Sequence, residues 1–271
     1  MKDFTLTTYR KLLIAVKEAG YAFFTFEEWC DGKAEGRYVI LRHDVDLKAA
    51  HSLATANIEN ELGIRATYYF RVVPESNQPE IIKAIAGLRH EIGYHYEDLS
   101  LFNGDEDKAL EHFKAQLVHF RQFYPVRTIC MHGSPTSKWD NRNLWKTNSY
   151  RDLGIIGEPY FDFLIQDNVF YLTDTARMWD GDKYNIRDKI SQQSAVNSQQ
   201  LSSKQLNNST AQPDIHSTFD FINWLQQKSD QNIIMITTHP QRWTDKQSEW
   251  IMEFIFQSLK NIIKRWISRR S

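Results

Sequence analysis

The sequence predicts an α/β protein whose strands form a parallel sheet, as either an α/β barrel or a doubly wound sheet. Strand-like apolar runs alternate along the chain with segments of helical period, and tight hairpin signals are few. Such alternation is typical of parallel strands joined by helical crossovers. At 271 residues the chain is long enough for one barrel domain, since single α/β barrels commonly run to about 250 residues.

The first half of the chain predicts regular elements in close succession. Helical spacing of apolar residues predicts a helix over 7–19 with Gly20 as its C-cap, and the aromatic-rich stretch 21–29 predicts a short strand and a turn of helix. The elements then expected in chain order are a strand at 38–46, a helix at 48–62, a strand at 66–72, a helix at 78–89, a strand at 91–95, a helix at 106–123 and a strand at 126–131.

The second half is less regular. Residues 133–165 are rich in Gly, Pro, Asn and Trp, which favours long loops with short elements. Residues 191–213 are dominated by Gln, Ser and Asn, and so little apolar surface predicts a mobile insertion rather than a domain boundary. The remaining elements expected are a strand at 168–173, a helix at 219–227, a strand at 232–238 and an amphipathic helix at 248–267. We therefore expect a single domain over 1–271.

Composition excludes several classes of function. The net charge of −1 gives no reason to expect a nucleic-acid partner, and two cysteines form neither a disulfide framework nor a thiolate zinc site. No apolar run approaches the roughly 20 residues of a membrane-spanning helix, and no secretory signal is recognisable, so we expect a cytoplasmic protein. We expect the apolar stripe of the helix at 248–267 to pack on the barrel, with an interfacial membrane helix as the alternative.

The strand at 38–46 brings charged residues to its carboxyl end. Arg42, Asp44 and Asp46 alternate along it and therefore point to one face. Two carboxylates held close together need a nearby cation to stay ionised, and a metal ion would serve. The alternative is that both aspartates begin a surface loop and cap the next helix.

Polar residues stand at or just after the carboxyl ends of five predicted strands. They are Asp44 and Asp46 at the strand already described, and His95, His132, Asp174 and His239 at later strands. In a parallel sheet or barrel all the carboxyl ends of the strands lie at one face, so these residues should converge there. Carboxylate and imidazole together suit zinc or a comparable divalent metal with three protein ligands and one open position.

Three motifs resemble those of the polysaccharide deacetylase family, also described as NodB-homology or carbohydrate esterase proteins. They are Arg42-His-Asp-Val-Asp46, Arg89-His-Glu-Ile-Gly-Tyr-His95 and Thr238-His-Pro240. The resemblance runs from about residue 38 to 240. It implies a distorted (β/α) barrel of the NodB-homology type and a divalent metal, with zinc as the first choice. It also implies a hydrolase that removes acetyl groups from N-acetylated sugars.

The resemblance also implies a role for each matching residue. Asp44 looks like the catalytic base, Asp46 like the metal-binding aspartate, His95 like the first metal histidine and His239 like the general acid. Val45 separates the two aspartates, which are adjacent in the family, so the two roles are open to exchange.

Two positions depart from the family pattern. Leu99 stands where a second metal histidine is expected, so we expect His132 or, alternatively, Glu97 to be the third ligand. The usual Arg-Pro motif of the fourth strand is also missing. Arg42 is expected to orient the catalytic base instead, through a bidentate contact.

Trp179 and Trp243 follow strands and are candidates for stacking on a carbohydrate substrate, with core packing as the alternative. The expected function is a metal-dependent enzyme that cleaves the C–N bond of an acetylated amino sugar. The alternatives are an inactive glycan-binding or scaffold protein on the same fold, and a hydrolase of a non-sugar amide or imide. The oligomeric state is not predicted.

Overall fold

The computed structural model describes residues 2–134, 137–179, 215–227 and 230–268, with side chains of the last helix described up to Asn261. At its centre is a sheet in which every strand pairing is parallel. The strands are β1 (Ala22–Phe24), β2 (Tyr38–Val45), β3 (Thr67–Phe70), β4 (Glu91–Tyr96), β5 (Ile129–Met131), β6 (Val169–Thr173) and β7 (Ile233–Thr238). Their order is β5-β4-β3-β2-β7-β6, and β1 pairs with the first half of β2.

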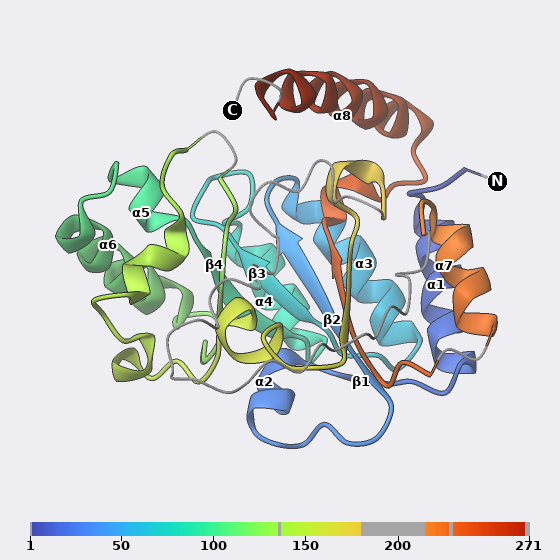
Figure 1. The fold of residues 1–271 in the computed structure, drawn as a ribbon, viewed down its shortest axis with the longest axis horizontal. Helices are drawn as coiled ribbons and strands as arrows, with labels where there is room; N and C mark the ends of the chain where they lie inside the picture. The colour runs from blue at the N-terminus through green and yellow to red at the C-terminus, as the bar shows by residue number, and fades with distance from the viewer. Residues whose placement is uncertain (1, 135–136, 180–214, 228–229, 269–271) are drawn as a thin grey trace, which may run out of the picture.

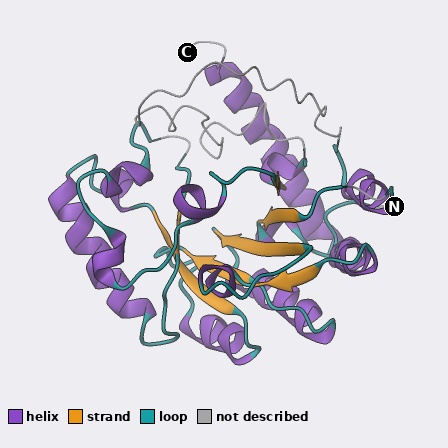
Figure 2. Ribbon diagram, turned by 60° about the horizontal axis from the view of Figure 1, so that its bottom comes forward, coloured by secondary structure: helices purple, strands orange, loops and turns teal. Residues whose placement is uncertain are grey.

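Helices surround the strands (Figure 2). They are α1 (Leu6–Glu18), α2 (Phe26–Cys30), α3 (Ala49–Glu61), α4 (Pro79–Gly87), α5 (Asp98–Leu101), α6 (Glu106–Phe120), α7 (Thr218–Gln226) and α8 (Gln247–Ser268). Helix α1 packs between α7 and α3, and α3 also packs against α4. The result is a mixed α/β fold with a curled, half-barrel sheet, compatible with the predicted distorted barrel (Figure 1). None of the helices in the described part is both long and apolar enough to cross a membrane.

Local signals explain the first elements. The Thr5 side chain caps α1 by accepting a hydrogen bond from the backbone N–H of Thr8. The chain leaves this helix through Gly20, whose φ of +84° lies in the left-handed region that glycine adopts without strain. Thr25 and Glu28 form a capping box that starts α2 immediately after β1. The predictions for 7–19 and 21–29 are therefore confirmed.

In the middle of the chain, the short helical turns at Asn141–Trp145, Tyr150–Leu153 and Pro159–Phe163 are the short elements expected among its loops. The strand before them is only partly as predicted. The strand predicted at 126–131 begins only at Ile129. The backbone just before it bonds to another segment, because the Ile156 N–H donates to the Arg127 carbonyl. The insertion predicted at 191–213 lies outside the described residues.

Strand β2 is buried along its whole length and separates two environments. His43 points toward α3, where its Nε2 lies 2.8 Å from Oε1 of Glu59 and its ring stacks on Tyr68. Arg42 and Asp44 point to the opposite face, where the Nε of Arg42 donates a hydrogen bond to Asp44. The alternation expected for a strand therefore puts the charged pair on one face of β2 and His43 on the other.

The carboxyl ends of the strands carry the polar residues that the sequence singled out. Asp46 follows β2 after Val45, and His132 directly follows β5. Asp174 and His239 directly follow β6 and β7, while His95 is the last residue but one of β4. Because all the pairings are parallel, these ends meet at one edge of the sheet.

Candidate metal centre

Asp46, His95 and His132 form a group that could hold a metal ion. Oδ1 of Asp46 lies 3.6 Å from Nε2 of His95 and 3.5 Å from Nε2 of His132. The three residues come from the ends of β2, β4 and β5. His95 is buried, and the other two are half-buried. Strands distant in sequence thus bring one carboxylate and two imidazoles together.

The other ring nitrogen of each histidine is occupied. Nδ1 of His95 lies 2.9 Å from the carbonyl oxygen of Cys130, which only accepts hydrogen bonds, so Nδ1 carries the proton. Nδ1 of His132 lies 2.9 Å from Oε2 of Glu97, and this carboxylate accepts in the same way. The neutral form of each ring therefore carries its proton on Nδ1 and leaves Nε2 unprotonated, which is the form that binds a metal.

The distances between the ligand atoms, and a carboxylate oxygen without a hydrogen-bond partner, both fit a divalent ion at the Asp46 group. Zinc bonds of about 2.0–2.1 Å at tetrahedral angles place ligand atoms about 3.4 Å apart, close to the two separations from Asp46. Among the described residues, Oδ1 of Asp46 is a buried oxygen with no hydrogen-bond partner. A buried carboxylate oxygen without a donor is costly, and a bound cation would satisfy it.

At Asp46 and His95, electrostatics favour the protonation states that a metal needs. Burial opposes ionisation of Asp46, but the neighbouring charges of His132, His239 and His95 hold its pKa below the usual value. Burial lowers the pKa of His95 to about 4, against the opposing influence of Asp44. At neutral pH Asp46 is therefore an anion and His95 a neutral base.

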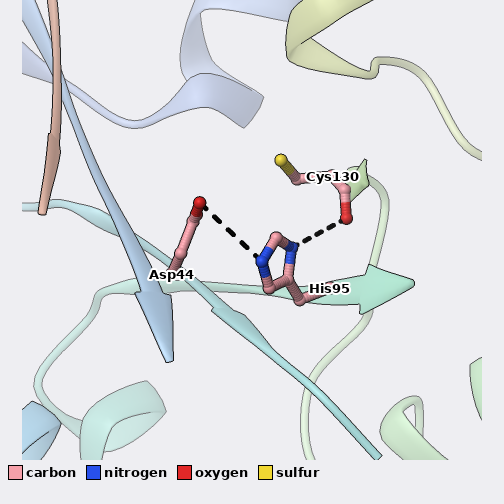
Figure 3. A group of neighbouring side chains, drawn as sticks. All are labelled: Asp44, His95 and Cys130. Carbon is pink, nitrogen blue, oxygen red and sulfur yellow. Dashed lines mark hydrogen bonds and ion pairs between the residues drawn. The ribbon is translucent and has the colours of Figure 1, made fainter. Parts of the chain in front are cut away.

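A second group consists of Asp44, His95 and Cys130 (Figure 3). It shares Nε2 of His95 with the first group, at 3.7 Å from Oδ2 of Asp44. Both oxygens of Asp44 already accept hydrogen bonds from Arg42. The Asp46 group is therefore the better metal site. Sequence patterns missed the second group because Cys130 reads as an ordinary apolar strand residue, and it is fully buried.

Arg42 makes a bidentate contact with Asp44. Its Nε lies 2.8 Å from Oδ1 and its Nη2 lies 2.6 Å from Oδ2. Burial opposes ionisation of Asp44, but the charges of Arg42 and His95 hold the pKa of its carboxyl well below the usual value. The guanidinium also lies 5.2 Å from the centre of the Tyr160 ring. The contact has the predicted geometry, and the catalytic role of the pair stays a prediction.

His239 is oriented by Asp174. Nδ1 of His239 lies 2.6 Å from Oδ1 of Asp174, and its backbone N–H donates to Oδ2 at 3.0 Å. Arg242 and Trp243 also donate to the Asp174 carboxylate. Nε2 is thus the ring atom that faces the site, at 3.9 Å from Oδ2 of Asp46.

Glu97 lies behind His132 and not among the ligand atoms. Its Oε1 accepts hydrogen bonds from Nε and Nη2 of Arg71, at 2.8 and 2.5 Å, and Oε2 faces His132. The structure thus favours His132 over Glu97 as the third ligand. Leu99, at the position where the resemblance to polysaccharide deacetylases led us to expect a histidine, is 2 % exposed and belongs to the hydrophobic core.

Two polar residues at the site were missed. Arg71 directly follows β3, but the strand predicted at 66–72 placed it inside the strand and not at its end. Gln241 donates from Nε2 to Oδ2 of Asp46 at 3.3 Å. No sequence signal distinguishes it from a surface glutamine.

The two tryptophans proposed for sugar stacking lie in the core. Trp243 is fully buried, and its Nε1 donates to Asp174. Trp179 is 3 % exposed, and its Nε1 donates to the Thr218 hydroxyl. A ring that is almost completely buried in the core offers no surface for a sugar, so the stacking prediction is wrong and the core-packing alternative holds. The position of a tryptophan after a strand does not show whether its side chain is exposed on a loop or buried in the core.

Comparison of the chain with protein-family models, with curated proteins and with solved structures gave no significant match.

Proposed function

We propose that the protein is a metal-dependent hydrolase that removes the acetyl group from an N-acetylated sugar of a glycan or glycan precursor. The observation that carries the proposal is the convergence of Asp46, His95 and His132 beside an Arg42–Asp44 pair and a His239–Asp174 pair. Asp46, His95 and His132 would hold the ion, with zinc as the first choice. When bound, a divalent metal would supply Lewis acidity toward water and toward an amide carbonyl.

Asp44 would be the general base. It is 4 % exposed and faces Nε2 of His95 at 3.7 Å, next to the proposed metal ligands. The hydrogen bonds from Arg42 keep its carboxylate ionised and fix its direction. In this position it would accept the proton that the attacking water loses.

His239 would be the general acid. The buried Asp174 carboxylate holds Nδ1 and the backbone N–H of the same residue, so the ring cannot turn freely. Its Nε2 would deliver a proton to the departing amine nitrogen. Proposed base and proposed acid thus come from β2 and β7, which are neighbouring strands.

The sugar substrate and the NodB-homology type of the barrel are both proposed from the three motifs that resemble polysaccharide deacetylases. Each motif contains residues of the candidate site: Asp44 and Asp46 in the first, His95 in the second and His239 in the third. The curled parallel sheet is compatible with that barrel.

Acetate release from acetylated amino-sugar oligomers, with added zinc or cobalt, tests the proposal. Asp44→Asn should lower the rate by about 10²–10⁴-fold, because the amide cannot accept the proton. The matched control is Asp107→Asn, since Asp107 is an exposed residue of α6. An Asp44→Asn protein as active as the parent would show that the mechanism is wrong.

Metal content separates this function from its main alternative. After incubation with zinc and removal of excess ion, the protein should retain about one equivalent. Retention of less than about a tenth of an equivalent would point instead to a glycan-binding or scaffold protein that lacks the reaction. If the metal-loaded protein cleaves linear or cyclic amides but no acetylated sugar, the result supports the other alternative, a metal-dependent hydrolase whose substrate is a non-sugar amide or imide.

A further inference from the structure

Helix α8 turns an apolar side away from the rest of the protein. Six of the eleven large apolar side chains that are exposed in the described part of the chain lie between positions 251 and 259 of α8. They are Ile251, Met252, Phe254, Ile255, Phe256 and Leu259, each between 42 % and 55 % exposed. The prediction that the stripe of this helix packs on the barrel is therefore wrong for Phe254, Ile255 and Leu259.

Polar and cation–π contacts hold the opposite side of α8 to the protein. Gln257 is 6 % exposed, and Asn261 donates from Nδ2 to the carbonyl of Ala176 at 3.2 Å. Arg177 donates to the backbone carbonyl of Trp250 at 3.1 Å, and its guanidinium lies 4.6 Å from the centre of that ring. A surface helix of a globular protein normally buries its apolar side. Because α8 exposes its apolar side, we expect a binding partner to cover it.

The sequence of the same end of the chain is basic. Residues 254–271 contain five lysines and arginines and no acidic residue, although the whole chain has a net charge of −1. The same stretch continues with Ile262, Ile263 and Trp266. Basic residues combined with aliphatic and aromatic ones are typical of helices that lie in the plane of an anionic membrane.

We propose that α8 docks the protein on an anionic lipid surface, with its apolar side in the headgroup region and the basic composition of 254–271 favouring an anionic surface. A second copy of the chain is a poorer occupant, because it would bring the same basic run. The acidic residues of the first half of α8 already have partners: Glu249 lies 3.0 Å from His51, and Glu253 lies 3.8 Å from Lys48.

The position of α8 relates this surface to the strand ends. In Figure 1 the helix lies along the top of the view, on the side toward which the β2 arrowhead points. Ala176, which accepts the hydrogen bond from Asn261, lies only two residues after Asp174. Docking through α8 would therefore hold the strand-end face near the lipid headgroups.

Vesicle co-sedimentation of the full chain tests the proposal. The protein should pellet with equimolar phosphatidylcholine–phosphatidylglycerol vesicles and about tenfold less with phosphatidylcholine alone, and high salt should release it. Ile255→Gln combined with Leu259→Gln should lower the bound fraction about tenfold, since both side chains form part of the apolar side. The matched control is Val118→Gln on α6, where the side chain is 63 % exposed.

Circular dichroism establishes that the variants are folded, as expected for exposed positions. Equal pelleting of the α8 variant and the parent would overturn the proposal, and so would failure of the parent to bind the anionic vesicles. Sedimentation velocity tests whether a second copy of the chain covers the apolar side instead. A parent dimer that the α8 substitutions convert to a monomer, with no vesicle binding, would assign the apolar side to a second copy.

Discussion

Oε2 of Glu97 lies 2.9 Å from Nδ1 of His132, and this contact turns Nε2 of the ring toward Asp46. Arg71 holds the other oxygen of the same carboxylate. A carboxylate behind a metal-binding imidazole fixes the tautomer and raises the basicity of the ring. Leu99 stands where a second metal-binding histidine was expected. In the proposed site His132, at the end of β5, takes that place, and Glu97, at the end of β4, orients it.

Glu97→Gln should weaken zinc binding about 10–100-fold, because a neutral amide orients His132 less strongly than a carboxylate. Competition with a chromophoric chelator measures the affinity. The control is Glu80→Gln, since the Glu80 side chain is 89 % exposed. Unchanged affinity in Glu97→Gln would show that Glu97 does not position the ligand, whereas a parent that binds no zinc would argue against the metal centre itself.

The same pair should give metal-free protein a pH-dependent stability. Burial opposes ionisation of Glu97, but the hydrogen bond and charge of His132 lower its pKa from 4.5 to about 2. A lowered pKa stabilises the fold above pH 4.5, and this contribution is lost as the pH falls toward 2. Burial opposes protonation of His132, but Asp46 and Glu97 raise its pKa above 6.5, so its contribution is present below pH 6.5 and lost at higher pH.

Glu97→Gln should therefore cost the most stability between about pH 4.5 and 6.5, on the order of 1–3 kcal/mol, and less at about pH 3 and about pH 9. Urea unfolding of the metal-free parent and variant across this range measures the difference. A cost that does not change with pH would mean that packing, and not the ion pair, is lost.

Arg42→Lys should lower kcat about 10–100-fold while the protein retains its zinc. A lysine ammonium keeps the charge but cannot make the two parallel hydrogen bonds that fix the Asp44 carboxylate. The zinc ligands proposed here do not include Asp44, so metal content should stay at the parental value. Steady-state kinetics together with metal analysis checks this. Loss of zinc in step with activity would contradict the separation of the two carboxylate roles.

Gly93→Ala should destabilise the fold by about 1–3 kcal/mol, because a Cβ there would overlap the Tyr69 ring and lie 2.9 Å from the Thr128 carbonyl oxygen. Gly87→Ala is the matched control. Nothing lies within 4 Å of the added Cβ at the end of α4, so that change should be neutral or stabilising by up to about 1 kcal/mol. The urea midpoints of unfolding of the two variants and the parent measure the difference. Equal changes in stability at the two glycines would refute the steric explanation.

The sequence by itself determined the alternation of strands and helices and which residues end the strands. Period-two alternation separates Arg42 and Asp44 from His43, and parallel pairing brings strand ends together, so both follow from local pattern. The contact between Arg42 and Asp44 was predictable for the same reason, because the two residues are neighbours on one face of one strand.

Only the tertiary structure decided the relations between strands. It oriented His132 through Glu97, buried Trp179 and Trp243 in the core, and turned the apolar side of α8 outward. Each outcome depends on which groups from distant segments fill the space around a side chain. A periodic pattern records the face on which a residue lies but not the neighbour that it meets there.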